Sequence, residues 1–285
     1  MVKFGIHCAV WTYSWSDDQM YLIEKAKKMG FDVFEITMRN LEVINSKKIK
    51  RELEANQMQA ICGLGLPQSA DITSSDPDMR KSGVQLLKET VKNVSAIGAQ
   101  LLTGVLYCPW NKSVKRGPTC DEINWSVEAI REVAQFAQDY SVVLGIEPIN
   151  RYETYLLNTA RQALDFIHLV GEENIGVHLD TYHMNIEEKN FAETINLVGH
   201  ELIHFHASDS NRGAPGSGNV EWDSVFRSLK QIDYNGAIGI ESFLKSDVDN
   251  PANTFIWRDI ANDSDSLAKD GLSFLKTKAK EFDLR

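Results

Sequence analysis

The segment IGVHLD, residues 175–180, decides the fold because its apolar, β-branched run ends on a residue that can bind a metal ion. Three other segments repeat this pattern: VVLGIE (142–147), LIHFH (202–206) and AIGIE (237–241). Parallel strands of a barrel present the side chains at their C-terminal ends to one shared cavity. Four terminal residues are therefore expected to converge on one ion: Glu147, Asp180, His206 and Glu241.

Four further runs have strand character: KFGIHCAV (3–10), DVFEIT (32–37), QAICGLG (59–65) and LLTGVLY (101–107). Strand starts are roughly 25–40 residues apart, the size of one strand–helix unit. Since no Pro/Gly-rich linker interrupts these units, the chain is predicted to be α/β, a single (β/α)8 TIM barrel over residues 1–285. A doubly wound open sheet usually has a Gly-rich first turn, and AVWTYSWSD (9–17) contains no glycine.

The sequence also predicts where several helices begin and end. Gly30 and Gly98 each follow an apolar-periodic segment and are expected to end helices in the left-handed conformation. Asp121 and Thr159 are interpreted as helix N-caps. The stretch 264–282 is expected to form the last helix, which closes the barrel.

Composition excludes several classes of protein. Forty acidic residues against thirty basic ones give a net charge of −10, which repels a phosphate backbone, so no nucleic-acid partner is expected. No apolar run is long enough to span a membrane. MVKFGIHCAV (1–10) lacks the features of a signal peptide, so a cytoplasmic location is expected. Without a CxxC pair, the four cysteines are expected to be reduced thiols.

Alternation along the strands assigns depth to the histidines. His178 shares a strand face with Asp180, and His204 shares one with His206. In each pair the second residue is nearer the rim, so Asp180 and His206 are assigned to the metal. His178 and His204 are assigned to a deeper hydrogen-bonded layer. His183 lies just past Asp180, where it could reach substrate or support a ligand.

The ligand types indicate the ion and the chemistry. Three carboxylates and one imidazole suit Mn²⁺, Mg²⁺ or Co²⁺ better than a thiolate zinc site. Glu147 and Glu241 come from different strands, so each could face one side of a substrate carbon. A metal would stabilise an enediolate as one Glu removes a proton and the other returns one to the opposite face. This arrangement predicts an epimerase.

The loops after the strands suit a sugar. Glu153 and Arg212 are polar and could bond hydroxyl groups. The segment NRGAPGSG (211–218) lacks the helix N-terminal glycine arrangement of phosphate-binding loops, so a non-phosphorylated substrate is favoured. Four aromatic residues could pack on the apolar faces of a carbon chain: Trp15, Trp110, Phe243 and Trp257.

Several of these segments resemble the ketose 3-epimerase family, which includes D-tagatose, D-psicose (allulose) and L-ribulose 3-epimerases within the sugar isomerase/epimerase TIM barrels. The resemblance extends over essentially the whole chain. The segments that carry it are ADITSSDP (70–77), GIEPINRYE (145–153), HLDTYHMNIEE (178–188), HFHASDSNRGAPGSG (204–218), IGIESF (238–243) and IWRD (256–259).

The resemblance implies inversion at C3 of free ketoses, such as fructose/psicose, tagatose/sorbose or L-ribulose/L-xylulose. It implies a Mn²⁺ or Co²⁺ ion on the four rim residues, with Glu147 and Glu241 as the acid/base pair. It also implies a homodimer or homotetramer. Three residues would hold the C1–C3 oxygens: Glu153, His183 and Arg212. Three aromatic residues would shape the pocket: Trp15, Trp110 and Phe243.

Two departures leave the preferred ketose open. His7 and Cys8 stand where relatives often carry Tyr or Phe, and the 106–120 loop is a further difference. Alternatives also remain. An aldose–ketose or hydroxypyruvate isomerase would use the same metal, and an inosose dehydratase would also remove an α-proton. An apurinic endonuclease would need more His and acidic ligands. A non-catalytic sugar-binding protein would not need paired Glu bases.

Overall fold

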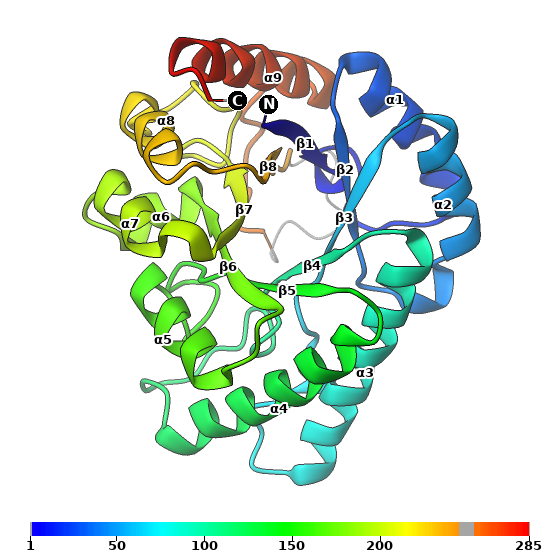
Figure 1. The fold of residues 1–285 in the computed structure, drawn as a ribbon, viewed down its shortest axis with the longest axis vertical. Helices are drawn as coiled ribbons and strands as arrows, with labels where there is room; N and C mark the ends of the chain where they lie inside the picture. The colour runs from blue at the N-terminus through cyan, green and yellow to red at the C-terminus, as the bar shows by residue number, and fades with distance from the viewer. Residues whose placement is uncertain (1, 245–253, 285) are drawn as a thin grey trace.

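Eight parallel strands form a closed barrel in the computed structural model, which describes residues 2–244 and 254–284 (Figure 1). Each strand pairs with the next along the chain, and the eighth closes on the first. The predicted (β/α)8 barrel is confirmed. The strands are β1 Lys3–His7, β2 Val33–Thr37, β3 Gln59–Gly63, β4 Leu101–Gly104, β5 Val143–Ile146, β6 Ile175–Asp180, β7 Leu202–Ala207 and β8 Ala237–Ile240.

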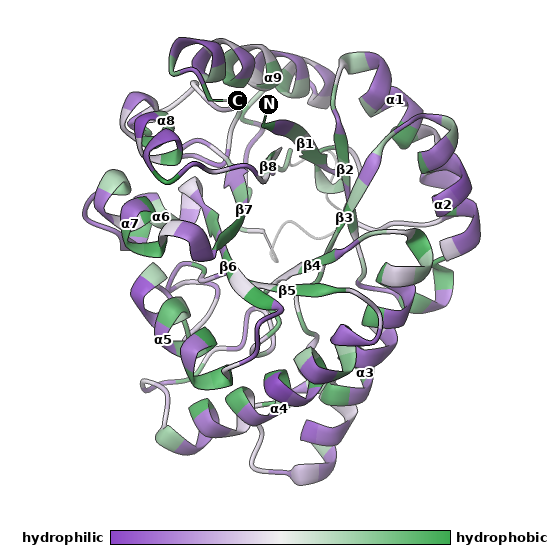
Figure 2. Cartoon of the chain, viewed as in Figure 1, coloured by the Kyte–Doolittle hydropathy of each residue, from purple (hydrophilic) through white to green (hydrophobic). Residues whose placement is uncertain are grey.

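Helices surround the barrel, as Figure 1 shows. Their hydrophilic residues face outward and their apolar residues face the strands (Figure 2), which is the arrangement that buries one hydrophobic stripe per helix. The helices are α1 Tyr21–Met29, α2 Ser46–Ala55, α3 Pro77–Ile97, α4 Cys120–Gln138, α5 Ala160–Val170, α6 Thr181–Glu187, α7 Phe191–Val198, α8 Trp222–Gln231 and α9 Ser264–Glu281.

Three of the predicted helix boundaries are confirmed. Gly30 and Gly98 end α1 and α3 with φ of 96° and 90°, values that a residue without Cβ adopts easily. Thr159 caps α5 by accepting a hydrogen bond from the backbone N–H of Gln162. The predicted last helix corresponds to α9.

The N-cap predicted at Asp121 is wrong. Helix α4 begins at Cys120, and its N-cap is Thr119, whose hydroxyl accepts from the backbone N–H of Glu122. The Glu122 carboxylate in turn accepts from the backbone N–H of Thr119 at 2.9 Å. This reciprocal capping box satisfies two backbone donors, whereas an Asp inside the first turn satisfies none of them by capping.

Strand register brings the rim residues to one level. Asp180 on β6 pairs with His206 on β7, and His178 pairs with His204 one layer deeper. His206 pairs on its other side with Gly239 of β8, so Glu241 follows two residues beyond. The closed barrel therefore places these side chains at its C-terminal mouth.

The four cysteines are free thiols, as expected. Cys120 is exposed, and the other three are buried. Within residues 2–244 and 254–284, no helix combines the length and the apolar character needed to cross a membrane.

Candidate metal and substrate site

A cavity of about 770 Å³, counted with its open mouth, lies at the C-terminal ends of the strands. Barrel enzymes carry their active sites at this face. The predicted site residues that line it are Trp110, Glu147, Glu153, His183, His206, Arg212, Glu241 and Phe243.

The four predicted metal ligands lie together. One ligand atom from each of Glu147, Asp180, His206 and Glu241 can be chosen so that all four lie within 4.8 Å of one another. All four side chains are largely buried, and Asp180 is 1% exposed. Carboxylate oxygens and one imidazole nitrogen at this spacing could hold one divalent cation.

Two unpartnered atoms test whether such an ion fits. Oε1 of Glu147 and Nδ1 of His206 are buried and have no hydrogen-bond partner in the described part of the chain. Nδ1 of His206 lies 3.3 Å from Oε2 of Glu241 and 3.8 Å from Oδ2 of Asp180. A buried polar atom without a partner is destabilising by roughly 1–3 kcal/mol. A dication among these atoms would satisfy both, so the residues fit a metal ion.

Arg212 lies on two of these carboxylates. Its Nη1 contacts Oδ2 of Asp180, and its Nη2 lies 2.5 Å from Oε2 of Glu241. Arg212 itself has a φ of 66° in the turn after β7, where its backbone N–H donates to the Asp209 carbonyl. The residue predicted to bind sugar hydroxyls thus also neutralises two acidic side chains.

The two glutamates are electrostatically different. Burial raises the pKa of Glu147 well above its ordinary value, and the neighbouring charge of Glu241 raises it further. Burial also acts on Glu241, but the charges of Arg212 and His206 outweigh it and hold the pKa of Glu241 well below its ordinary value. Paired carboxylates whose pKa values diverge are typical of acid/base sites.

His206 has a raised pKa for a similar reason. Burial alone would lower its pKa, but the carboxylates of Glu35 and Glu241 outweigh burial and raise it well above the ordinary value. A cation bound at Nδ1 would replace a proton there, because a ligating imidazole nitrogen must be unprotonated.

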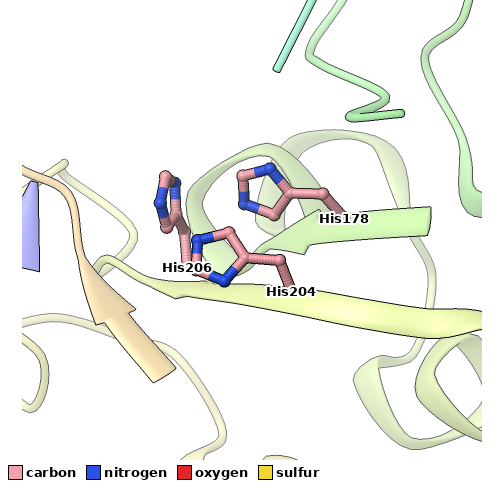
Figure 3. Close-up of side chains that lie close together, drawn as sticks. All are labelled: His178, His204 and His206. Atoms are coloured by element: carbon pink, nitrogen blue, oxygen red, sulfur yellow. The ribbon is translucent and has the colours of Figure 1, made fainter. Parts of the chain in front are cut away.

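The deeper histidine layer was predicted, and both of its members are buried. Figure 3 shows His178, from β6, beside His204 and His206, from β7. His178 Nδ1 lies 2.9 Å from the Thr103 hydroxyl. Glu35 Oε2 lies 3.0 Å from Nε2 of His204 and 2.8 Å from Nε2 of His206.

Glu35 was not predicted as part of the site. It lies within β2 in the run VFEIT and not at a strand end, so the rim pattern does not single it out. The available signal was its charge inside a buried strand, because a buried carboxylate requires hydrogen-bond or charge partners.

A second group of polar side chains faces the ligands. Glu153 accepts from Trp110 Nε1 at 3.0 Å and from Asn150 Nδ2 at 2.8 Å. His183 Nδ1 accepts from the backbone N–H of Asn150 at 3.2 Å. The other ring nitrogen of His183, Nε2, lies 3.9 Å from Oε1 of Glu147. Trp110, Glu153 and His183 are therefore held in place before any substrate binds.

The structure places two predicted aromatic residues outside the cavity lining. Trp15 is 3% exposed and packs edge-on against Phe34, on the helix-facing side of β2, with ring centroids 5.6 Å apart. Trp257 is 62% exposed, whereas the preceding Ile256 packs beside Phe243. Their sequence position after a strand did not determine which way these side chains turn.

Other lining residues were not assigned to the site in advance. The Arg39 guanidinium lies between two rings at the mouth, 4.3 Å from the Tyr13 centroid and 4.4 Å from that of Trp110. His7 Nδ1 accepts from the Ala9 backbone N–H at 3.1 Å, which directs Nε2 away from that loop. Tyr182 also lines the cavity.

Comparison with known proteins shows which family shares this sequence and fold. The family model described as the xylose isomerase-like TIM barrel matches residues 23–278. An L-ribulose 3-epimerase of Methylomonas sp. (strain DH-1) is 37% identical over 278 residues, covering 96% of this chain and 97% of that protein. The chain belongs to the ketose 3-epimerase family.

Further relatives are 3-epimerases as well. A D-psicose 3-epimerase of Ruminiclostridium cellulolyticum is 35% identical to this ketose 3-epimerase family member, over 94% of this chain and 93% of that protein. A crystal structure of a D-allulose 3-epimerase from Methylomonas sp. superposes with a TM-score of 0.94 at 36% identity, covering 97% of this chain and 98% of that one. The resemblance seen in the sequence is confirmed, and this family member is an isomerase.

Proposed function

We propose that this protein inverts the configuration at C3 of free ketoses, with one divalent metal ion and with Glu147 and Glu241 as the acid/base pair. Candidate pairs are fructose/psicose, tagatose/sorbose and L-ribulose/L-xylulose. The relatives named above are 3-epimerases of psicose, allulose or ribulose. The observation that carries the proposal is the meeting of two glutamates, Glu147 directly after β5 and Glu241 directly after β8, in one largely buried four-residue cluster.

Removal of the C3 proton requires stabilisation of the negative charge that develops on the substrate oxygen. A proton next to a carbonyl is too weakly acidic for a carboxylate to remove unaided. A divalent ion on the four residues, with Mn²⁺ our first candidate and Co²⁺ or Mg²⁺ as substitutes, would act as a Lewis acid on the charge that develops on oxygen. The carboxylates themselves do the proton transfer.

The two glutamates divide the proton transfer between them. One carboxylate removes the C3 proton and leaves a cis-enediolate that is planar at C3. The carboxyl group of the other glutamate then delivers a proton to the opposite face, which inverts C3. Return to the same face gives exchange without epimerisation. Which glutamate acts first depends on the direction of the reaction.

The surrounding side chains would position the sugar. Glu153, His183 and Arg212 are already oriented by the contacts described above, and would bond the C1–C3 oxygens. Trp110 and Phe243 provide apolar walls. Preorganisation of this kind lowers the entropic cost of orienting a flexible substrate.

We also propose that the protein works as a homodimer or homotetramer.

The test is incubation of the purified protein with Mn²⁺ and a panel of ketohexoses and ketopentoses in deuterated water. We expect products that differ only at C3, separated by chromatography, with deuterium at that carbon. Aldose products with label at C1 or C2 would instead identify an aldose–ketose isomerase. Catalytic efficiency across the panel identifies the preferred ketose.

A further inference from the structure

Glu35 links β2 to β7 across the inside of the barrel. Its side chain is 2% exposed, and its Oε2 is within hydrogen-bond distance of both His204 and His206, at 3.0 and 2.8 Å. Three carboxylates and Arg212 already gather at the rim above. A fourth buried carboxylate beneath them requires a specific reason, because burying a charge is costly unless it is paired.

The two contacts determine where each imidazole carries its proton. An ionised carboxylate only accepts hydrogen bonds, so both histidines donate their Nε2–H to the same oxygen. In the neutral ring that binds a cation, the lone pair of His206 is then on Nδ1. That atom is the one that lies 3.3 Å from Oε2 of Glu241 and 3.8 Å from Oδ2 of Asp180, without a hydrogen-bond partner in residues 2–244 and 254–284.

Glycines on neighbouring strands leave room for this arrangement. A Cβ at Gly63 of β3 would lie 3.2 Å from Oε1 of Glu35. A Cβ at Gly239 of β8 would lie 3.1 Å from Cδ2 of His206 and 3.6 Å from Oε2 of Glu35. Both positions are therefore too tight for a methyl group, so glycine at each of them leaves the space that the carboxylate and the ring occupy.

We propose that Glu35 is a positioning residue for the metal ligand His206, fixing its Nε2-protonated tautomer and ring orientation so that Nδ1 faces the ion. The inference rests on the metal site of the proposed function. Glu35 acts through His206, and His204 is the second donor to the shared carboxylate oxygen. Such outer carboxylates typically contribute 10–100-fold to metal affinity.

The same histidines suggest a competing assignment. Nitrogens of His178, His204 and His206 also lie within 4.8 Å of one another, which is the spacing of a second metal site. However, Nε2 of both His204 and His206 is engaged by Glu35, and Nδ1 of His206 faces the rim ligands. With one ion at the rim site, the two hydrogen bonds to Glu35 and the approach of His206 Nδ1 to Glu241 are all explained, and no second ion is required.

The experiment titrates metal-free protein with Mn²⁺ by calorimetry, in the native form and in two variants. Glu35→Gln keeps the size of the side chain but has one acceptor oxygen and no charge. Glu122→Gln is the matched control, because it removes another buried, hydrogen-bonded carboxylate that touches no metal ligand. Far-UV circular dichroism verifies that each variant is folded.

We expect one Mn²⁺ per native chain, 10–100-fold weaker binding in Glu35→Gln, and native affinity in Glu122→Gln. Equal affinity for Mn²⁺ in Glu35→Gln and in the native protein would overturn this inference and leave the proposed function intact. Two ions per native chain would also overturn it. Failure of the native protein to bind Mn²⁺ would remove the proposed metal-dependent function as well.

A second measurement needs no variant, in case Glu35→Gln does not fold. Histidine-labelled native protein loaded with diamagnetic Mg²⁺ is examined by ¹⁵N nuclear magnetic resonance. We expect a directly bonded proton on Nε2 of His206. A proton on Nδ1, or metal ligation through Nε2, would contradict the proposed role of Glu35.

Discussion

Nη2 of Arg212 lies 2.5 Å from Oε2 of Glu241, so the guanidinium neutralises a carboxylate that the proposed metal ion would also bind. The other terminal nitrogen of Arg212 contacts Asp180. The Asp180 carboxylate is fully buried and the Glu241 side chain is only 13% exposed, so little water solvates their charge. The Arg212 charge and a bound cation are therefore expected to stabilise the same acidic cluster.

Replacement of Arg212 by Met should destabilise the metal-free protein by about 3 kcal/mol, because it leaves buried carboxylates without their cationic partner. Mn²⁺ should restore part of that loss. Urea unfolding with and without the ion measures both effects. The control is Arg151→Met, which removes an exposed partner of Glu187 and should change the stability much less, with or without Mn²⁺. Equal losses in the two variants would contradict this account.

The acid/base assignment predicts an asymmetric exchange pattern. Glu147→Gln and Glu241→Gln should each lower epimerisation by about 10³-fold, since each removes one proton-transferring group. Each variant should still exchange the C3 hydrogen with solvent for one epimer only, and the two variants should favour opposite epimers. Proton resonance spectra in deuterated water report the exchange, with bound Mn²⁺ verified in parallel. Exchange of both epimers in one variant and of neither in the other would indicate a single base.

Gly145 allows β5 to pass close to β4. A Cβ there would lie 2.4 Å from the Thr103 hydroxyl and 2.8 Å from the Thr103 Cβ. Gly145→Ala should therefore reduce the free energy of unfolding by about 1–3 kcal/mol through overpacking. Gly117→Ala is the control, because no atom lies within 4 Å of its added Cβ, and it should be neutral. Thermal unfolding of both variants distinguishes these outcomes.

Glu122 should make the stability depend on pH. Arg116, at 2.7 and 3.0 Å, and Thr119 hold the pKa of Glu122 down from its ordinary 4.5 to about 2. The folded-state pKa is the lower one, so the stabilisation is fully present above about pH 4.5 and is lost as the pH falls toward about 2.

Glu122→Gln should therefore be less stable than the native protein at neutral pH, by about 1 kcal/mol, because Arg116 is half exposed. The difference should shrink as the pH is lowered. Urea unfolding curves at a series of pH values measure it. A difference that is constant down to about pH 3 would show that the charge of Glu122 contributes nothing.

The sequence predicted the strand-end residues at the rim of the site better than the residues that lie deeper in the barrel. Glu147, Asp180, His206 and Glu241 each end a strand-like run, and parallel strands bring such ends together whatever the details of packing. Glu35 lies in mid-strand, and its role depends on which side chains meet across the barrel. That pairing is a property of register and barrel closure, which no local pattern in β2 reveals.

The direction of loop side chains could also not be predicted from the sequence. Trp15 and Trp110 both follow strands and differ little as local patterns, yet Trp15 packs against Phe34 and Trp110 lines the cavity. Loop packing decides between these orientations, not spacing. The error at Asp121 has a different cause, since Thr119 and Glu122 have the spacing of a capping box that was present in the sequence.

The most direct test is a crystal structure with Mn²⁺ and a ketose, with data collected at a wavelength where manganese scatters anomalously. The account predicts one anomalous peak, bound by Glu147, Asp180, His206 and Glu241, with the two glutamate carboxylates on opposite faces of C3. No peak at these residues, or both glutamates on one face of the sugar, would contradict it.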